Sequence, residues 1–435
     1  MEFTKEVKQR VFLIGLYTGK EKREEYERTV DELEHLSKTA GADVLGRFVQ
    51  HLEKPNPATY IGKGKIAEIK TETKSKDIDT LIFNDNLSPA QAKNIARITN
   101  CNIVDRTELI LDIFATHAQT KQAKMQVELA MLQYNYSKLR NLWQHFSRIE
   151  GGIGLRGPGE TQIELDRREI KKKISILQRR IKDLDKISVV KRKKRSNLKN
   201  VSLIGYTNAG KTTLFNRITG EHLYVADQLF ATLDSTTRAI QRNGEERIVI
   251  SDTIGFIKKL PHTLVSSFHS TLLEVTEADL LLHVVDVSQP DFEQYIEAVN
   301  DVLQEIGADD KDILYVFNKL DMLKDTVKTK FVKKGLMMKY PASVFISAKY
   351  DENFEELFSL IFDYLSNIKR EEVLHIPLEM KKLISFLKSQ VEVLEKQIDK
   401  SNKEQILKVR IAKELSQKVR KQIDDYKFRQ YINEE

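Results

Sequence analysis

The chain has 435 residues and a formal net charge of +7, a length that allows two to four domains with apolar cores. The single Cys101 excludes an internal disulfide framework, and no apolar run is long enough to cross a bilayer. Because the N-terminus also lacks a secretory signal pattern, we expect a cytoplasmic protein. Residues 166–195 hold 14 Lys and Arg against 4 Asp and Glu, which exceeds the charge excess of the whole chain and is typical of a polyanion-binding segment.

Residues 1–115 alternate between strand and helix patterns. Residues 11–17, 43–52, 78–83 and 102–104 are predicted strands, and Val30, Leu33 and Leu36 recur at helical spacing. Ser88 and Pro89 are predicted to begin another helix, because serine caps helix N-termini and proline fits the first turn. This alternation predicts a small parallel α/β domain.

Residues 56–65 of this domain form a polar loop with two glycines and two lysines, before a helix predicted at Ile66. Such a loop can hold a phosphate, either of RNA or of a second nucleotide. A flexible connection would have the same composition, and the sequence does not decide between these interpretations.

Residues 116–196 carry two apolar stripes at helical spacing, which we interpret as packing surfaces. The stripes run from Met125 to Leu142 and from Ile163 to Leu184, and residues 151–160 between them are glycine-rich. Two such helices predict an antiparallel hairpin with a projecting tip. The five glycines of the tip would allow close approach to another backbone, and Arg156 can meet phosphates; plain flexibility is the alternative.

The second helix of this hairpin continues into basic runs at residues 171–173, 179–180 and 191–195. A basic run often forms only a solvated face, but these runs lie beside a projecting tip and therefore favour contact with RNA. Binding of this kind reads the shape of a folded RNA and weakens steeply with salt.

Residues 197–369 begin with the most specific pattern of the chain. Residues 205–212 read Gly-Tyr-Thr-Asn-Ala-Gly-Lys-Thr, between an apolar strand pattern and a helical stretch. Glycines let the backbone N–H groups of such a loop surround a phosphate chain, and the following helix adds its positive N-terminal end. We expect Lys211 to reach the β- and γ-phosphates and the Thr212 hydroxyl to bind Mg²⁺.

Two further patterns concern the γ-phosphate. Residues 230–237 form a threonine-rich loop, and Asp252 and Gly255 follow a predicted strand, where they can hold Mg²⁺ through water and sense the γ-phosphate. The next residue is Phe256, whereas many GTPases place a water-orienting glutamine there. Phenylalanine cannot orient water, so the sequence predicts slow intrinsic hydrolysis.

Two patterns at the ends of later strands select the base. Asp321 ends the sequence Asn-Lys-Leu-Asp at residues 318–321, and its carboxylate can accept from two adjacent guanine donors that adenine lacks. The backbone of residues 347–349 can meet the guanine carbonyl. The order of all these patterns predicts a GTP-binding domain of the doubly wound, Ras-like type, with its site at the carboxyl edge of the sheet.

Residues 370–435 are predicted to form a small α+β interaction domain. Strand patterns at residues 373–378, 391–398 and 405–411 accompany helical patterns at residues 380–387 and after Ala412. The whole chain is therefore expected to be a multidomain α/β protein with domains at residues 1–115, 116–196, 197–369 and 370–435.

The sequence at residues 151–168, from the glycine tip to Arg168, resembles the signature of the HflX family of translational GTPases, part of the Obg-HflX group of P-loop GTPases. Residues 205–212, 230–234, 252–256 and 318–321 are similar to its GTPase motifs, including phenylalanine in place of glutamine. The resemblance covers about residues 10–370. It implies a bacterial cytoplasmic GTPase that binds the large ribosomal subunit, is stimulated by ribosomes and splits stalled or stress-damaged 70S ribosomes.

The resemblance further implies that Thr212 and Thr232 bind Mg²⁺ and that the glycine tip enters the large subunit near the peptidyl-transferase region. It also implies a weak ATP site in the N-terminal domain, for which residues 62–65 are the candidate. We expect a monomer with GTP or GDP and Mg²⁺ as ligands, contacts with rRNA, and no stable membrane insertion beyond a peripheral association.

The predicted catalytic residues are Lys211, Thr232 and Gly255. The predicted nucleotide-binding residues lie in five motifs: Gly205, Tyr206, Thr207, Asn208, Ala209, Gly210, Lys211, Thr212, Thr213, Phe230, Ala231, Thr232, Leu233, Asp234, Asp252, Thr253, Ile254, Gly255, Asn318, Lys319, Leu320, Asp321, Ser347, Ala348 and Lys349.

Two other functions compete with ribosome splitting. A GTP-dependent RNA-modification or ribosome assembly factor would need, for modification, a catalytic residue or cofactor site outside residues 200–370, and the sequence suggests none. A non-enzymatic RNA-binding module would use GTP only as a conformational ligand. Multiple-turnover hydrolysis in the presence of ribosomes would argue against this last function.

Overall fold

A computed structural model describes residues 8–19, 23–149, 158–193, 198–223, 228–241, 247–258, 267–323, 327–367, 369–399 and 403–434. The contacts divide the chain into two compact units. The first comprises residues 1–240 and 247–350, and the second comprises residues 241–246 and 351–435. Residues 151–157 of the glycine-rich tip and the last basic residues at 194–195 lie outside the described residues.

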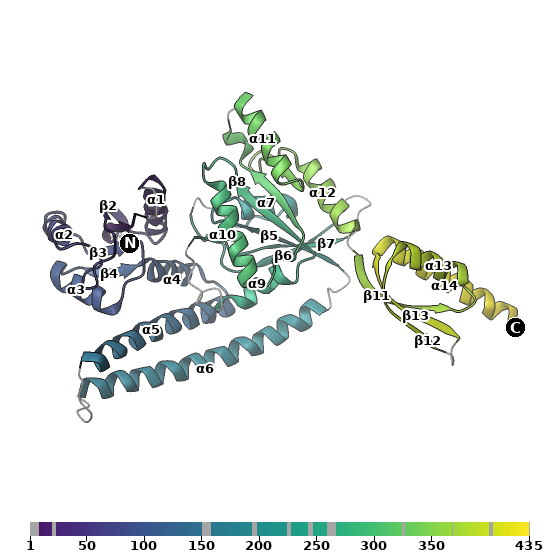
Figure 1. The fold of residues 1–435 in the computed structure, drawn as a ribbon, viewed down its shortest axis with the longest axis horizontal. Helices are drawn as coiled ribbons and strands as arrows, with labels where there is room; N and C mark the ends of the chain where they lie inside the picture. Colours follow the sequence, from purple (N-terminus) through teal and green to yellow (C-terminus); the bar gives the residue numbers. More distant parts are fainter. Residues whose placement is uncertain are drawn as a thin grey trace, which may run out of the picture. The chain divides into compact units, whose positions relative to one another are not determined.

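The first unit begins with a parallel sheet of four strands in the order β2-β1-β3-β4 (Figure 1). Its strands are β1 (Arg10–Tyr17), β2 (Asp43–His51), β3 (Thr80–Phe83) and β4 (Asn102–Asp105). The helices between and after them are α1 (Arg23–Thr39), α2 (Lys63–Lys76), α3 (Pro89–Thr99) and α4 (Arg106–His117). The central strand β1 is a continuous apolar run because helices cover both faces of a parallel sheet. The predicted parallel α/β domain is confirmed.

Two helix starts in this domain test the sequence rules. Ser88 caps α3 through a capping box with Gln91, as its position before Pro89 predicts. By contrast, α2 begins at Lys63, so the helix start predicted at Ile66 is wrong by three residues. The apolar period begins only at Ile66 because the first turn of α2 is mostly solvent-facing, and periodicity therefore does not reveal that turn.

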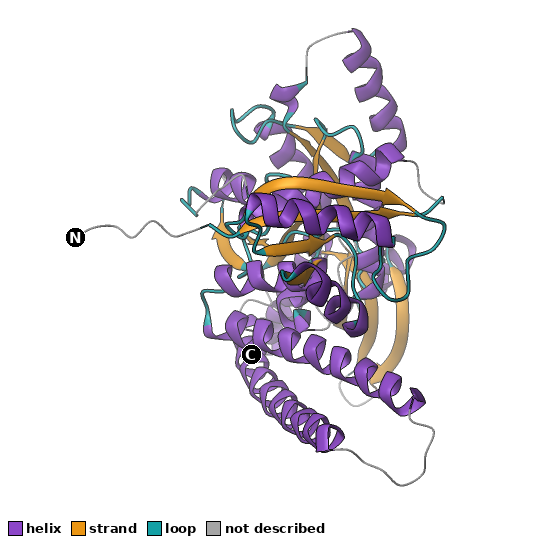
Figure 2. Ribbon diagram, turned by 90° about the vertical axis from the view of Figure 1, so that its left-hand side faces the viewer, coloured by secondary structure: helices purple, strands orange, loops and turns teal. Residues whose placement is uncertain are grey.

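Helices α5 (Lys121–Ile149) and α6 (Pro158–Lys193) lie side by side as the predicted hairpin (Figures 1 and 2). Leu129 of α5 and Leu177 and Ile181 of α6 form a small buried cluster between them. The lysines at residues 171–173 and the arginines at 179–180 are exposed on α6. The apolar stripes are thus packing surfaces, and the described basic side chains face solvent.

The second sheet of this unit has six strands in the order β10-β9-β8-β5-β7-β6, of which only β6 runs antiparallel to its neighbour. Its strands are β5 (Lys199–Gly205), β6 (Thr236–Ile240), β7 (Ile248–Asp252), β8 (Leu280–Asp286), β9 (Ile313–Asn318) and β10 (Ser343–Phe345). The accompanying helices are α7 (Lys211–Thr219), α9 (His269–Thr276), α10 (Phe292–Glu305), η1 (Leu320–Met322) and α11 (Val327–Lys339). The chain order reverses between β5 and β8, which is where ligands bind in open α/β sheets.

The second unit contains a three-stranded antiparallel sheet in the order β11-β13-β12. Its elements are α12 (Phe354–Asn367), β11 (Lys369–Pro377), α13 (Lys381–Gln390), β12 (Glu392–Asp399), β13 (Glu404–Ala412) and α14 (Lys413–Glu434). Apolar residues of the strands, α13 and α14 form one core, as the predicted α+β arrangement requires. None of the described helices in either unit combines the length and the apolar character that crossing a membrane requires.

Candidate functional site

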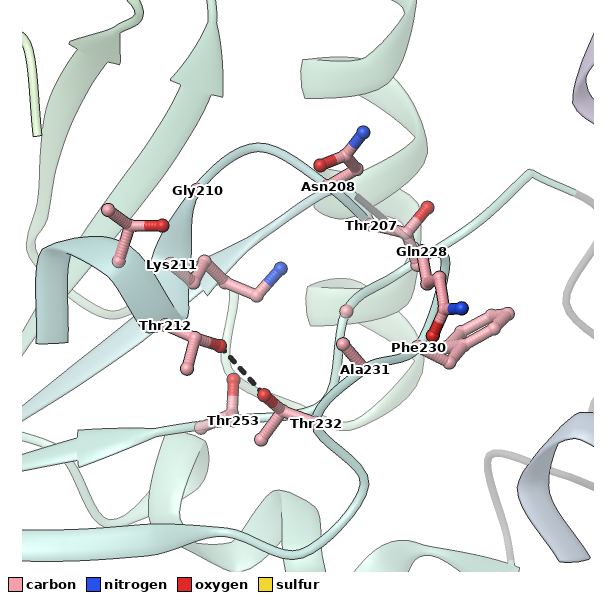
Figure 3. A pocket seen from close by; sticks show the side chains of 12 residues that line it. Thr207, Asn208, Gly210, Lys211, Thr212, Gln228, Phe230, Ala231, Thr232 and Thr253 are labelled. Carbon is pink, nitrogen blue, oxygen red and sulfur yellow. Dashed lines mark hydrogen bonds between the residues drawn. The ribbon is translucent and has the colours of Figure 1, made fainter. Parts of the chain in front are cut away.

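A pocket lies at the carboxyl end of β5, where residues 205–210 lead into α7 (Figure 3). Gly205 and Gly210 both have positive φ, and no other residue fits at either position. A Cβ at Gly205 would lie 2.2 Å from the Val284 carbonyl oxygen, and one at Gly210 would lie 2.3 Å from the Asn318 amide nitrogen. The two glycines therefore let the loop pass close to β8 and β9 while it curves around the pocket.

Lys211 begins α7 and points into the pocket (Figure 3). Its ammonium group donates to the carbonyls of Gly205 at 3.0 Å and Tyr206 at 2.8 Å, so the loop itself fixes the side chain. Burial lowers the pKa of Lys211 to about 8, against the opposing effect of the Asp252 carboxylate. A bound phosphate chain would supply the negative charge that this buried cation lacks.

Three oxygen-bearing side chains meet beside Lys211. The Thr212 hydroxyl lies 2.7 Å from the Thr232 hydroxyl (Figure 3). It also donates to the Asp252 carboxylate at 2.8 Å. Burial raises the pKa of Asp252 to about 6, partly offset by Lys211 and the two threonines, and its Oδ1 atom has no hydrogen-bond partner. Two hydroxyls and an incompletely satisfied buried carboxylate match the oxygen ligands of Mg²⁺, so the residues present fit this ion.

The segment after β7 runs alongside the phosphate loop. The Thr207 N–H donates to the Phe256 carbonyl at 2.8 Å, and the Phe256 N–H donates to the Gly205 carbonyl at 3.1 Å. A Cβ at Gly255 would lie 2.8 Å from the Thr207 methyl and 3.2 Å from the Lys211 ammonium, so only glycine fits there. The Phe256 ring is 2% exposed and packs in the core with Ile204 and Leu272. It therefore contributes no group to the pocket.

The residues predicted to recognise the base are joined to the phosphate loop through Asn318. Its amide donates to the Ala209 carbonyl at 2.9 Å and accepts from the Ala348 N–H at 3.0 Å. The Ser347 hydroxyl donates to the Asp321 carboxylate at 2.6 Å and so orients the exposed acceptor. The Lys319 ammonium pairs with Asp286 at 2.8 Å, which fixes this end of β9 against β8.

The pocket brings 11 of the 25 predicted nucleotide-binding residues together. The pocket is lined by Thr207, Asn208, Gly210, Lys211, Thr212, Thr213, Gln228, Phe230, Ala231, Thr232, Thr253 and Gly255. Gln228 is the addition, and its sequence signal was only its place two residues before the threonine-rich loop.

Three predicted residues direct their side chains away from the pocket. The Tyr206 ring stacks on Tyr295 at 4.2 Å and its hydroxyl bonds Glu32 in the N-terminal part. Leu233 lies in the core, and the Asp234 carboxylate bonds Thr120. For these three residues, as for all the other predicted site residues, contact with nucleotide remains a prediction.

Three family models match successive parts of the chain. Residues 27–115 match the family model described as GTP-binding GTPase N-terminal, residues 117–195 match GTP-binding GTPase Middle Region, and residues 200–319 match 50S ribosome-binding GTPase. These matches cover both the hairpin and the phosphate loop.

The chain is similar to individual proteins over most of its length. It is 44% identical over 377 residues to GTPase HflX of Flavobacterium psychrophilum, covering 83% of this chain and 91% of that one. It is 41% identical over 371 residues to GTPase HflX of Escherichia coli, covering 85% and 86%. A solved structure of a GTP-binding protein from Sulfolobus solfataricus in complex with GDP is 26% identical, covers 82% of this chain and 98% of that one, and has a TM-score of 0.43.

Proposed function

Because this chain belongs to the HflX family of ribosome-associated GTPases, we propose that it binds the large ribosomal subunit and splits stalled or stress-damaged 70S ribosomes. One observation carries the proposal: a GTP pocket and a helix with exposed lysines and arginines belong to the same compact unit. The match to a family described as 50S ribosome-binding GTPases supports the choice of subunit. The proposed location is the cytoplasm.

The chemistry follows from the pocket residues. Lys211 would bind the β- and γ-phosphates, the Gly255 N–H would sense the γ-phosphate, and Asp321 would select guanine. Thr212 and Thr232 would hold Mg²⁺, which supplies neutralisation of phosphate charge when bound. Since Phe256 is buried in the core, we infer that the bound ribosome supplies the group or geometry that orients the attacking water.

The conformational cycle uses the same residues. GTP closes the loop that carries Thr232, the closed form binds the ribosome, and hydrolysis releases it. The 2.7 Å distance between the Thr232 and Thr212 hydroxyls supports this cycle, because both side chains would have to reach the same ion in the closed form.

The test is multiple-turnover GTP hydrolysis with and without purified large subunits, and the same mixture with 70S ribosomes on a density gradient. Lys211→Ala is the blank. Strong stimulation together with loss of 70S particles supports the proposal, and neither stimulation nor subunit binding overturns it. Stimulation with intact 70S particles would favour the assembly or RNA-binding alternative.

The exposed basic face of α6 provides a second test. Replacing the three lysines at residues 171–173 by alanine should weaken large-subunit binding and reduce the dependence of log affinity on log salt by up to about three, since each lost phosphate contact removes about 0.9 from this slope. The matched control replaces Lys70, Lys74 and Lys93, three exposed lysines of the N-terminal domain. An equal loss in both triple variants would show only a general charge effect.

A further inference from the structure

The loop that carries Thr232 is held from outside the GTPase sheet, at the junction between α4 and α5. The His117 Nδ1 atom donates to the Phe230 carbonyl at 2.8 Å. The Phe230 ring packs edge-on against Phe114 of α4, with ring centroids 4.6 Å apart. Phe230 has φ of +58°, which is uncommon for a bulky residue and needs surrounding contacts to hold it.

A second anchor lies two residues beyond Thr232. The Asp234 carboxylate accepts from the backbone N–H groups of Gln119 at 3.1 Å and Thr120 at 3.2 Å, and from the Thr120 hydroxyl. These donors lie just before α5, where backbone N–H groups lack partners within the helix and the helix dipole favours a negative charge. The Thr120 hydroxyl in turn accepts from the Ala123 N–H at 3.1 Å. Asp234 therefore completes the N-terminal cap of α5.

Thr232 lies between these two anchors. Leu233, its neighbour, is 2% exposed and is buried in the core that Phe114 and other α4 residues form. Because Phe230 and Asp234 are both fixed, the backbone of residues 231–233 between them has little conformational freedom. Its hydroxyl is 2.7 Å from that of Thr212 in the resulting position.

We propose that His117 and Thr120 are positioning residues for GTP hydrolysis: they hold the loop at residues 230–234 so that Thr232 faces Thr212 and Asp252. This inference goes beyond ribosome binding, but it rests on the role proposed above for Thr232. Neither residue lines the pocket, so they act through the loop rather than on the nucleotide.

The chain offers a matched control for simple domain packing. Arg28 of α1 pairs with Asp291, which directly precedes α10. This ion pair also joins the N-terminal part to the GTPase sheet, but it touches none of the residues around Thr232. Arg28→Ala therefore removes a comparable contact without releasing the loop.

The experiment compares wild type with Thr120→Val, Thr120→Ser, His117→Ala, Arg28→Ala and Thr232→Ala. The single-turnover rate of bound GTP and the affinity for GTP are measured for each, together with hydrogen exchange at residues 228–234 in the presence of a non-hydrolysable GTP analogue. We expect Thr120→Val and His117→Ala to lower the rate about tenfold or more and to speed exchange in the loop, with GTP affinity changed less than about threefold. Thr120→Ser and Arg28→Ala should behave like wild type.

Three results would overturn the inference. Wild-type rates and exchange in Thr120→Val and His117→Ala, when Thr232→Ala is slow, would reject the positioning role alone. An equal slowing in Arg28→Ala would show that any loosening of the packing is sufficient. A fast Thr232→Ala variant would instead remove the role of Thr232 and, with it, the premise of the inference.

Discussion

The two sheets of the first unit share a topological feature, but among the described residues only the GTPase sheet carries a phosphate loop there. In the N-terminal sheet the chain order reverses between β1 and β3, and in the GTPase sheet it reverses between β5 and β8. After β5, two glycines with positive φ lead the backbone around an open pocket that ends in a helix N-terminus. At the corresponding edge of the N-terminal sheet, side chains hydrogen-bond to one another.

The side chains at that edge of the N-terminal sheet form a hydrogen-bonded cluster. Asp85 accepts from the Tyr60 hydroxyl at 2.6 Å and from the Tyr26 hydroxyl at 3.2 Å. The Tyr26 hydroxyl also accepts from the Leu16 N–H at 2.7 Å, and a Cβ at Gly15 would lie 2.9 Å from the Tyr26 ring. A reversal of strand order therefore does not by itself make a ligand site. The residues of the loop at that edge determine whether a pocket forms there.

The predicted ATP site at residues 62–65 lies in the same N-terminal domain and stays a prediction. The Gly62 N–H donates to the Gln50 side chain at 2.8 Å, and the Lys65 ammonium pairs with Glu68 at 2.7 Å. A phosphate would have to replace both contacts.

The largest expected effect is a loss of GTP hydrolysis when the buried lysine of the GTPase pocket is removed. Lys211→Ala should lower kcat/KM for GTP at least about a hundredfold, because the phosphates lose a buried cation. Steady-state hydrolysis measures it, with Lys74→Ala of exposed α2 as the control. Wild-type hydrolysis in the Lys211 variant would contradict the assigned site.

The second-largest effect is a change in the choice between guanine and xanthine nucleotides. Asp321→Asn should weaken GTP binding on the order of a hundredfold and strengthen XTP binding, because xanthine carries a carbonyl where guanine carries an amino donor. Displacement of fluorescent GDP by GTP and XTP measures this change. The exposed Asp309→Asn should leave both affinities unchanged. An unchanged preference in Asp321→Asn would place the base elsewhere.

A smaller effect concerns the hydrogen-bonded side chains at the edge of the N-terminal sheet. Tyr60→Phe should lower the opening free energy of β1 and β3 by about 1 kcal/mol, since Asp85 loses one donor in a partly buried place. Hydrogen exchange of the amides in these strands measures it. GTP affinity should stay at the wild-type value. A marked loss of GTP affinity would show that the two sheets are not separate in function.

The smallest effect is a pH dependence in β8. Burial, with a further contribution from the charge of Lys211, lowers the pKa of His283 to about 3. Below about pH 6.5 the histidine of the unfolded state takes up a proton, while the folded histidine stays neutral. The free energy of unfolding is therefore unaffected by this group above pH 6.5 and falls as the pH decreases from 6.5 toward 3.

Hydrogen exchange of β8 amides, corrected for intrinsic rates, should show this contribution as about 1 kcal/mol less protection at pH 5.5 than at pH 7. His283→Leu should lack that difference. An equal fall in the variant would assign the pH dependence to other groups.

The sequence predicted most elements of both sheets and of the second unit, because their signals are local. Residues 205–212 and 318–321 are contiguous motifs, and the strands of the tail follow a regular apolar pattern. The start of α2 was missed because its first turn lacks apolar residues. The contacts of Asp234 with Thr120 and of Tyr206 with Glu32 join residues more than 100 positions apart, and no local pattern specifies such pairs.

The most direct test of the account is co-sedimentation of the protein with purified large subunits, loaded with either a non-hydrolysable GTP analogue or GDP. We predict strong binding with the analogue, weak binding with GDP, and loss of this difference in Thr232→Ala, because Thr232 is the proposed link between the γ-phosphate and closure of its loop. Equal binding with both nucleotides, or no binding with either, would contradict a GTP-controlled encounter with the ribosome.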